Sequence, residues 1–388
     1  MVGNEIRLLR KNGCDVVPWI IPTRESGLAN LLRCGLSAVW NPFAARTLKK
    51  LIRREQPDIA HCHNTFPLMS PSIFAACHDA GIPVIQTIHN YRHICPAGGF
   101  FRDGHLCEEC MGTTFPLPAL KHRCYRGSLL ATTIPALTVC IQRIRRTFTR
   151  DVDAVIALNE FEKNKLIEGG FSPERVLIKP NFCPEPDAPH PPDHSSKPSF
   201  ILCFAGRLSV DKGIHVLLEA WSGFMDRLSR EEKELVCLRI AGDGELRETV
   251  AAAASGPSAG IQYLGSLSHD KTLDMIRESD CLACPSIWYE GMPMTILEAF
   301  SFGIPVIASQ IGGLPELIEE EQNGLLFSPG EAPELAALLH RLYADPGLRS
   351  DMMDRTRAIY RERYTEEVNY PQLDSIYRET IRRRQSAS

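Results

Sequence analysis

Two carboxylates, Glu290 and Glu298, lie eight positions apart where the sequence changes from a loop to a helical pattern. Gly291 permits a tight turn, and Pro293 suits the first position of a helix, where no backbone N–H is needed. The helix, under way by Thr295, would offer backbone N–H groups and a positive dipole end to a phosphate. Carboxylates beside it would accept hydrogen bonds from sugar hydroxyls. The spacing of the two carboxylates alone is more typical of solvated surface, so whether they belong to a binding site depends on the residues around them.

Three other loops carry residues that suit a diphosphate. Arg207 and Lys212 follow a predicted strand, where a guanidinium can bind two oxygens at once and an ammonium acts as a movable point charge. The alternative interpretation of these two cations is a solvated turn. Glycine-containing loops at 241–246 and 309–318 also follow predicted strands. The carboxyl ends of parallel strands share one edge of a sheet, so we expect all four loops to converge there.

The bulk composition bounds the class of protein. A length of 388 residues favours two domains, and 44% hydrophobic with 23% charged residues is typical of a soluble globular chain. The formal charge of -4 gives no indication of a nucleic-acid partner. Neither a spanning helix nor a signal peptide is apparent, so a cytoplasmic location is the default expectation. Most of the fourteen cysteines lie singly in apolar surroundings, which predicts reduced core thiols, and Cys281 and Cys284 belong to such an apolar strand.

The first half of the chain alternates between strand and helix patterns. It opens on a helix that ends at Lys11 before Asn12-Gly13, followed by a predicted strand at 14–21. Further strands are predicted at 58–63, 84–90 and 154–158, with helices at 44–55 and 71–80. The alternation predicts an α/β domain with a parallel sheet. A doubly wound domain normally opens on a strand and a glycine-rich turn, so we expect this domain to lack its first strand.

A proline-rich linker at 184–198 predicts the boundary between two such domains. We expect an N-terminal domain over 1–183, a C-terminal domain over 199–365, and a last helix over 366–388 that crosses back to the first domain. The second domain repeats the alternation, with strands predicted at 199–204, 236–241, 261–263, 281–285 and 305–308 and helices at 214–228, from 295, and at 332–343. Two doubly wound domains that face each other would place the chemistry in the cleft between them.

The motifs together resemble one family. G-R-L-S-V-D-K-G (206–213), A-G-D-G-E-L (241–246), E-G-M-P-M-T-I-L-E-A (290–299), G-G-L-P-E-L-I (312–318) and N-G-L-L-F (323–327) resemble the retaining glycosyltransferases of family 4, or group 1, which have the GT-B fold. The segments 58–64 and 85–90 resemble two inner strands of that family's first domain. The resemblance implies catalytic roles for Arg207, Lys212, Glu290 and His89. It implies contacts with the nucleotide sugar for Gly206, Gly242, Gly244, Glu245, Ser286, Gly291, Met292, Pro293, Met294, Thr295, Glu298, Gly312 and Gly313.

By this resemblance the protein would move a sugar from a nucleotide-diphosphate sugar to a hydroxyl of a glycan or lipid-linked acceptor, in cell-surface polysaccharide synthesis. Glu290 would hold sugar hydroxyls, Glu298 the ribose, and the two cations the leaving diphosphate. Fixed positive charge would then stabilise the departing group, so no metal cofactor and no separate catalytic base are expected. Two alternatives stay open: a non-catalytic nucleotide-sugar-binding relic that lacks the glycine-rich turn, and a nucleotide-sugar epimerase. His89 also has a simpler interpretation, as a hydrogen-bonded histidine at a strand end.

A weakly hydrophobic insertion at about 91–126 contains Cys95, Cys107, Cys110 and Cys124. Four thiolates at this spacing, in a segment with little core of its own, suit a structural zinc. Similar cysteine-bearing insertions are found in a subset of the family that the chain resembles. The alternative is a set of free or reactive thiols.

Basic residues follow the apolar stretch 129–141, which predicts a helix with a basic end. The basic residues are Arg143, Arg145, Arg146 and Arg150, and the apolar Phe148 lies among them. Such a helix could lie on an anionic membrane surface and make the protein peripheral to the inner face of a membrane. An ordinary surface helix is the alternative, and the Arg382–Arg384 run could add to either.

Overall fold

The computed structural model describes residues 1–21, 35, 37–186, 200–256 and 260–386. The chain forms two compact units: unit 1 comprises Met1–Pro180 and Tyr370–Ser388, and unit 2 comprises Asn181–Asn369. The change of unit therefore comes slightly before the predicted linker, most of which lies outside the described residues. The last helix, α17 (Glu366–Ser386), begins in unit 2 and continues into unit 1.

Unit 1 contains a parallel four-stranded sheet with the order β1-β2-β5-β6. Its strands are β1 (Ala60–Cys62), β2 (Val84–Thr87), β5 (Ala154–Ala157) and β6 (Val176–Ile178). A separate antiparallel hairpin pairs β3 (Phe101–Arg102) with β4 (His105–Leu106). The described helices are α1 (Val2–Lys11), α3 (Pro42–Glu55), α4 (Ser72–Asp79), η1 (Tyr91–His93), α5 (Leu117–Lys121), α6 (Leu129–Ile144), α7 (Thr147–Arg150), α8 (Glu160–Glu168) and η2 (Pro173–Arg175). The predicted parallel α/β organisation is thus present.

The strand predicted at 14–21 is wrong. This segment leaves α1 as an irregular chain, with Val17 and Ile20 exposed. The carbonyl of Val16 accepts from the Arg10 guanidinium at 3.0 Å, and Pro18 has no N–H to donate to a neighbouring strand. An apolar, β-branched composition was therefore insufficient to form a ladder here.

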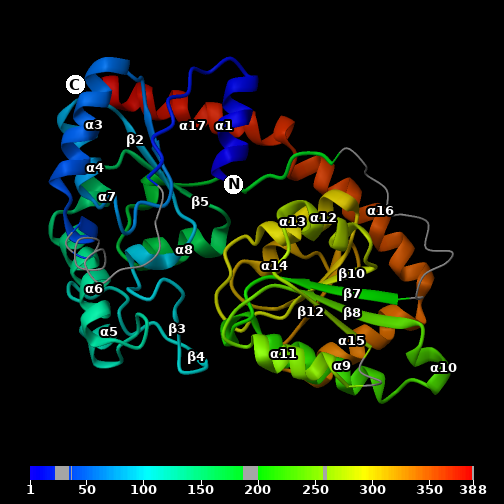
Figure 1. Ribbon diagram of the computed structural model, residues 1–388. Helices are drawn as coiled ribbons and strands as arrows, with labels where there is room; N and C mark the ends of the chain where they lie inside the picture. The colour runs from blue at the N-terminus through cyan, green and yellow to red at the C-terminus, as the bar shows by residue number, and fades with distance from the viewer. Residues whose placement is uncertain (22–34, 36, 187–199, 257–259, 387–388) are drawn as a thin grey trace. The chain divides into compact units, whose positions relative to one another are not determined.

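The core of unit 1 joins the two ends of its sequence to the middle of the sheet. Leu9 of α1 and Leu373 and Ile376 of α17 pack in one cluster with Ile85 of β2 and Ile156 of β5. Figure 1 shows α3 and α4 on the other side of β2 from α1 and α17. The sheet is therefore covered on both faces, and α1 is held firmly enough to position a buried side chain.

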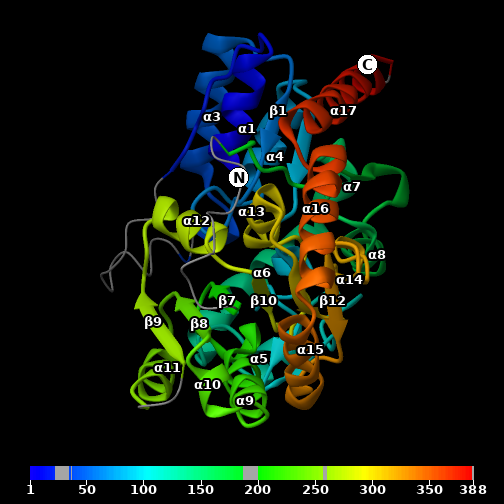
Figure 2. The same cartoon turned by 90° about the vertical axis from the view of Figure 1, so that its right-hand side faces the viewer.

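Unit 2 contains a six-stranded parallel sheet with the order β12-β11-β10-β7-β8-β9. Figure 2 labels β9, β8, β7, β10 and β12 in turn across this sheet. The strands are β7 (Phe200–Ala205), β8 (Val236–Ala241), β9 (Ile261–Gly265), β10 (Cys281–Cys284), β11 (Val306–Ser309) and β12 (Gly324–Phe327). The chain moves outward from β7 to β9 and then in the other direction from β10 to β12. The strand order thus reverses between β7 and β10, the point where open α/β sheets bind ligands.

Helices cover both faces of this sheet, with α9, α11 and α15 on one side and α12 and α13 on the other (Figure 1). Trp221 and Phe224 of α9 and Leu335 of α15 are buried against the strands in a single core. The thiols of Cys281 and Cys284 are buried in β10, as predicted for an apolar strand. The helices described in unit 2 are η3 (Val210–Lys212), α9 (Ile214–Met225), α10 (Arg230–Lys233), α11 (Arg247–Ala254), α12 (His269–Arg277), α13 (Met294–Phe302), α14 (Leu314–Leu317), α15 (Ala332–Ala344) and α16 (Pro346–Arg363).

Candidate functional site

Four loops of unit 2 meet at the carboxyl edge of its sheet, next to the reversal of strand order. They follow β7, β8, β10 and β11, and backbone hydrogen bonds tie them together. The N–H groups of Leu208, Ile287 and Gly313 donate to the carbonyls of Asp243 (2.9 Å), Asp211 (2.9 Å) and Glu290 (2.8 Å), respectively. Each bond joins two different loops, so the four loops form one connected platform. Their predicted convergence is confirmed.

Two of the glycines in these loops are required by the contact between loops. A Cβ on Gly242 would lie 1.8 Å from the carbonyl oxygen of Gly206, and one on Gly312 would lie 2.6 Å from that of Glu290. Both glycines also have positive φ angles, of 150° and 62°. The glycine motifs therefore let the backbones of neighbouring loops touch, in addition to any approach to a ligand.

An ion pair lies at the centre of the platform. Lys212 Nζ is 2.6 Å from Glu290 Oε1, and that oxygen also accepts from the Ser286 hydroxyl at 2.6 Å. The Lys212 ammonium lies 4.9 Å from the centroid of the Trp288 ring, whose buried Nε1–H has no hydrogen-bond partner among the described residues. Ser286 and Trp288 thus hold the pair in place, and the indole N–H is a spare donor. The sequence marked Ser286 for a ligand contact and gave no signal for Trp288.

The second predicted cation is on the surface. The side chain of Arg207 is 60% exposed and lies 2.6 Å from Asp211 Oδ2. Glu245 accepts a hydrogen bond of 3.3 Å from the Val210 N–H at the start of η3. Asp211 was not singled out from the sequence, although the Arg207–Asp211 spacing of four residues is a familiar ion-pair signal. Arg207, Asp211 and Glu245 therefore form a polar rim around the first loop.

Glu298 is buried on α13 at 8% exposure. Burial raises the pKa of its carboxyl, and His269 Nδ1 on α12 lies 3.8 Å from Glu298 Oε1. His269 is exposed and was not predicted from the sequence, because the residues next to it in the sequence form no recognisable motif. Burying an acid that ionises at neutral pH costs stability, so this position is not explained by the fold alone.

The entrance to α13 differs in detail from the prediction. Pro293 is the N-cap residue, and Met294 and Thr295 occupy the first turn. Among the described residues, no side chain caps this end of the helix. Met292 is buried, and its sulfur and carbonyl accept from the N–H and side-chain amide of Asn181 at 3.1 and 3.3 Å. Met292 therefore has a packing role here, whereas Gly291 lies between it and Glu290 in the connecting loop.

In unit 1, His89 follows β2 and lines a small open depression. His63, Asn64, Thr87 and Arg92 are among the other residues that line it. Burial lowers the pKa of His89 to about 3. The imidazole is therefore neutral near pH 7, able to donate from one nitrogen and accept at the other.

The four cysteines predicted to bind zinc lie near one another in unit 1. Burial, with the neighbouring thiols contributing, raises the pKa of Cys110 to about 12 and that of Cys124 to about 11. Among the described residues, the group whose potential ligand atoms all lie within 4.8 Å of one another is Glu5, His61 and His63, and the cysteines do not form such a group. The donor type thus suits zinc, but the sulfurs are wider apart than a closed tetrahedral site requires.

Some of the residues at the predicted basic end of α6 make contacts within unit 1, and others are exposed. Arg143 donates to the carbonyls of Cys110 and Ile94, and Arg145 lies 4.5 Å from the ring centroid of Trp40. Phe148 is buried and packs on Phe171. Arg146 and Arg150 are exposed, the latter beside Asp151. The helix with a basic end is therefore present, and Arg146 and Arg150 are the two of these arginines that are exposed.

Comparison with known proteins agrees with this geometry. The family model for glycosyl transferases group 1 matches residues 189–359, and the model for glycosyltransferase family 4 matches residues 6–184. An uncharacterized glycosyltransferase of Methanocaldococcus jannaschii is 24% identical over 348 residues, which cover 88% of this chain and 79% of the relative. Glycogen synthase of Mycobacterium tuberculosis is 30% identical over 343 residues, covering 86% of this chain and 69% of the relative.

A solved structure shares the fold. The crystal structure of Anabaena Alr3699/HepE in complex with UDP matches with a TM-score of 0.62 and 18% identity, over 86% of this chain and 81% of that one. The matched family models between them account for both units, and the two parallel sheets agree with the solved fold. The chain therefore belongs to the group 1 glycosyl transferases of family 4, and it is a transferase of the GT-B fold class.

Proposed function

We propose that this protein is a retaining glycosyltransferase that moves a sugar from a nucleotide-diphosphate sugar to a hydroxyl group of a glycan or lipid-linked acceptor. The observation that carries the proposal is the platform of four hydrogen-bonded loops at the strand-order reversal of unit 2. It gathers two cations, two buried carboxylates and an uncapped helix N-terminus on one unit. The Anabaena protein was crystallised in complex with UDP, which supports a nucleoside diphosphate as the common part of the donor.

The cations suit the leaving group. Breaking the bond between sugar and phosphate places negative charge on the diphosphate, and a fixed ammonium such as Lys212 stabilises that charge without reorganising. In the free protein Lys212 is held by Glu290, so the ammonium is already in position before a diphosphate arrives. Arg207, exposed on the rim, would meet the outer oxygens of the same group.

The carboxylates suit hydroxyls. Glu290 accepts from Ser286 and Lys212 through Oε1, which leaves Oε2 for a hydroxyl of the donor sugar. Glu298 would accept hydrogen bonds from the ribose, and this contact would compensate for burying its charge. We propose that the acceptor hydroxyl forms its bond to the anomeric carbon on the side from which the diphosphate leaves, and that a phosphate oxygen takes the hydroxyl proton.

Proton NMR of the product tests the stereochemistry. The purified chain is incubated with UDP-glucose, UDP-galactose, UDP-N-acetylglucosamine and GDP-mannose in turn, each with a hydroxyl acceptor. The proposal expects nucleoside diphosphate release and a new glycosidic bond with the anomeric configuration of the donor. An inverted product contradicts the retaining mechanism. Isomerisation of the nucleotide sugar without transfer identifies the chain as an epimerase instead.

We also propose that a zinc ion organises the cysteine-bearing segment. Cys95 and Cys110 are buried in a part of unit 1 whose described strands are the short pair β3 and β4, and the thiols of Cys95, Cys107 and Cys124 contribute to the raised pKa of Cys110. About one zinc per chain is expected by elemental analysis, and Cys107→Ser with Cys110→Ser should remove it and lower the melting temperature. The matched control is Cys203→Ser, at a core thiol of unit 2, which should keep the zinc. Metal-free wild-type protein of full stability contradicts the proposal.

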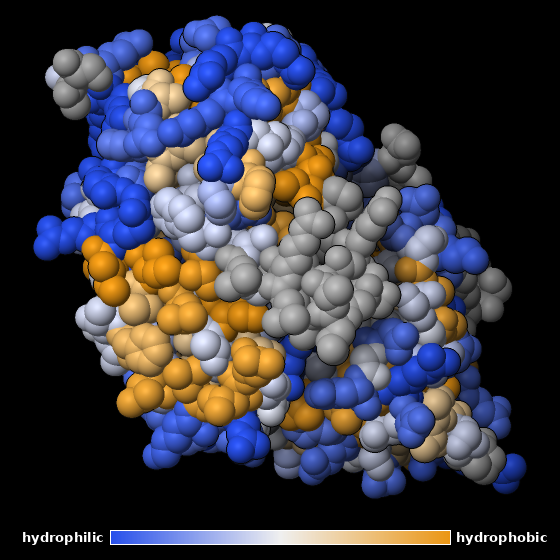
Figure 3. Space-filling model, turned by 60° about the vertical axis from the view of Figure 1, so that its left-hand side comes forward, coloured by the Kyte–Doolittle hydropathy of each residue, from blue (hydrophilic) through white to orange (hydrophobic). Residues whose placement is uncertain are grey.

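We further propose that α6 contacts an anionic membrane surface, as a lipid-linked acceptor would require. Leu130, Leu137 and Ile144 recur every seven residues and are exposed along one side of this helix. Figure 3 shows a broad hydrophobic area on one face of the molecule, and Arg126 and Arg146 are exposed near the two ends of α6. Within the described part of the chain, the helices lack the length and apolar composition needed to cross a bilayer.

Vesicle sedimentation checks this surface. Wild-type protein should bind vesicles containing phosphatidylglycerol more tightly than vesicles of phosphatidylcholine alone. Leu130→Asp with Leu137→Asp should weaken binding by at least roughly ten-fold, because two leucines can no longer be buried. Leu235→Asp, at a leucine of comparable exposure in unit 2, is the control and should bind normally. Equal binding of all variants, or none by the wild type, contradicts the proposal.

A further inference from the structure

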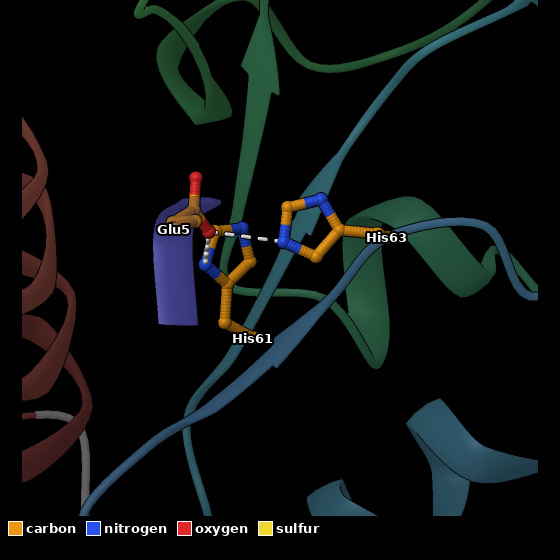
Figure 4. A group of neighbouring side chains, drawn as sticks. All are labelled: Glu5, His61 and His63. Atoms are coloured by element: carbon orange, nitrogen blue, oxygen red, sulfur yellow. Dashed lines mark hydrogen bonds and ion pairs between the residues drawn. The ribbon is translucent and has the colours of Figure 1, made fainter. Parts of the chain in front are cut away.

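Three titratable side chains meet inside unit 1, behind the depression that His89 lines. Figure 4 shows Glu5 on α1 with its carboxylate turned toward His61 and His63. Glu5 Oε1 lies 3.1 Å from His61 Nδ1 and 3.0 Å from His63 Nε2, and the three side chains are 3%, 9% and 11% exposed. The chain of contacts continues outward, because His63 Nδ1 lies 3.0 Å from His89 Nε2 and the two rings are stacked.

The surroundings of these side chains favour hydrogen bonding over a metal ion. The Lys179 ammonium lies 3.7 Å from Glu5 Oε2 and is buried. Both nitrogens of His61 have hydroxyl partners, with Tyr377 at 2.7 Å from Nδ1 and Thr87 at 2.7 Å from Nε2. A divalent cation would have to displace these contacts and lie beside the ammonium, at a large electrostatic cost.

The hydrogen-bond pattern determines where each proton lies. An ionised carboxylate can only accept, so His63 must donate to Glu5 from Nε2. Glu5 already faces the Lys179 ammonium, so a singly protonated His63 is the form that adds no unbalanced buried charge, and in that form its Nδ1 is an acceptor. His89 must then donate to it from Nε2, which leaves Nδ1 of His89 as an acceptor. Each bond sets the tautomer of the next ring.

We propose that Glu5 and His63 are positioning residues that hold His89 as a neutral imidazole with its proton on Nε2. In that form His89 presents Nδ1 as a hydrogen-bond acceptor to a hydroxyl of the ligand in the depression. The ligand class is a polyhydroxylated molecule, a sugar if the proposed transferase function is correct, and the inference rests on that function for its role in catalysis.

This arrangement suits the proposed reaction. If the sugar bound in the depression is the one transferred, positive charge develops on its ring as the leaving group departs, and an imidazolium lining the depression would raise the barrier. A neutral acceptor instead orients a hydroxyl without adding charge. Burial lowers the pKa of His89, in agreement with a ring that stays neutral. Glu5 lies far along the sequence from His89, so neither residue marks the other as its partner.

Nitrogen NMR of the intact chain labelled with 15N-histidine reads the tautomer directly. The spectrum is recorded without any sugar nucleotide, and the His89 signals are assigned by their loss in His89→Gln. We expect a neutral ring protonated on Nε2 at pH 7. A proton on Nδ1, an imidazolium, or a mixture of tautomers in the wild-type protein overturns the proposal. So does a stoichiometric divalent metal in the purified protein that is lost in Glu5→Gln.

Variants then separate positioning from folding. His63→Phe keeps a ring but removes the acceptor, so the Nε2-protonated fraction should fall and kcat should drop by roughly ten-fold with an unchanged Kd for the nucleotide. Glu5→Gln should act in the same direction and more weakly, because an amide can still accept. His105→Phe, at an exposed histidine of the same unit, is the control and should change neither quantity.

The outcomes are distinguishable. If the tautomer is as expected but the wild-type protein transfers no sugar, the proposed function fails and the positioning of His89 stands. If transfer proceeds and His63→Phe leaves both the His89 spectrum and kcat unchanged, the function stands and the positioning role is overturned. Should His63→Phe fail to fold, the wild-type spectrum alone still decides the tautomer.

Discussion

Replacing Lys212 by alanine is expected to lower kcat by roughly two to three orders of magnitude. The ammonium is 2.6 Å from Glu290 in the free protein and is the better buried of the two cations on the platform. Its charge is needed most when the diphosphate leaves, so the effect should fall on turnover more than on the Kd of the nucleotide. Steady-state kinetics and isothermal titration calorimetry measure the two quantities.

Two variants accompany this measurement. Lys212→Arg keeps the charge and should recover part of the turnover, whereas Lys271→Ala removes an exposed lysine of α12 and should have wild-type kinetics. If Lys212→Ala lowers kcat no more than Lys271→Ala does, Lys212 does not take part in the reaction. A loss of melting temperature together with kcat would indicate that the Lys212–Glu290 pair is needed for folding rather than for transfer.

Replacing Glu298 by glutamine is expected to weaken nucleoside diphosphate binding by roughly ten- to hundred-fold. A carboxylate accepts hydrogen bonds from two ribose hydroxyls more strongly than a neutral amide does. The same change should leave the melting temperature at pH 7 unchanged or raise it. Burial raises the pKa of Glu298 in the folded protein, so the free energy of unfolding falls as the pH rises through that pKa and the carboxyl group ionises. The neutral amide of glutamine avoids this loss of stability.

The control for Glu298 is Glu248→Ala, which removes an exposed acid of α11. Calorimetric titration with UDP, GDP and ADP gives the affinities, and thermal unfolding gives the stabilities. Weaker binding together with a lower melting temperature would point to a structural role for Glu298. Unchanged binding would show that this carboxylate does not contact the nucleotide.

Most of the platform could be predicted because its residues are local in sequence. The loops at 206–213 and 290–299 carry their own strand and helix signals, so the sequence places Lys212 and Glu290 each after the end of a strand. That these two strands are neighbours is seen only in the structure. Their pairing follows once the sheet order is known. The role of Gly242 and Gly312 in loop-to-loop contact could not be seen, because it depends on which backbones meet in space.

The parts that were missed depend on distant residues. Glu5 reaches His63 only because α1 packs on the sheet, and Tyr377 reaches His61 from the last helix of the chain. The segment 14–21 was wrongly predicted as a strand, because the strand propensity of its residues does not tell whether a neighbouring strand is available for pairing. Likewise the sequence could not show that the guanidinium of Arg143, in the last turn of α6, donates to backbone carbonyls from another part of unit 1.

Hydrogen–deuterium exchange with a nucleoside diphosphate tests the central claim most directly. The chain is labelled alone and with UDP, GDP and ADP in turn. At least one of them should protect the loops that follow β7, β8, β10 and β11, because these loops hold Arg207, Lys212 and Glu290 near one sheet edge and the loop after β10 leads into α13, which carries Glu298. No protection by any of the three nucleotides, or protection confined to segments outside these four loops, would contradict the assignment of the platform as the donor site.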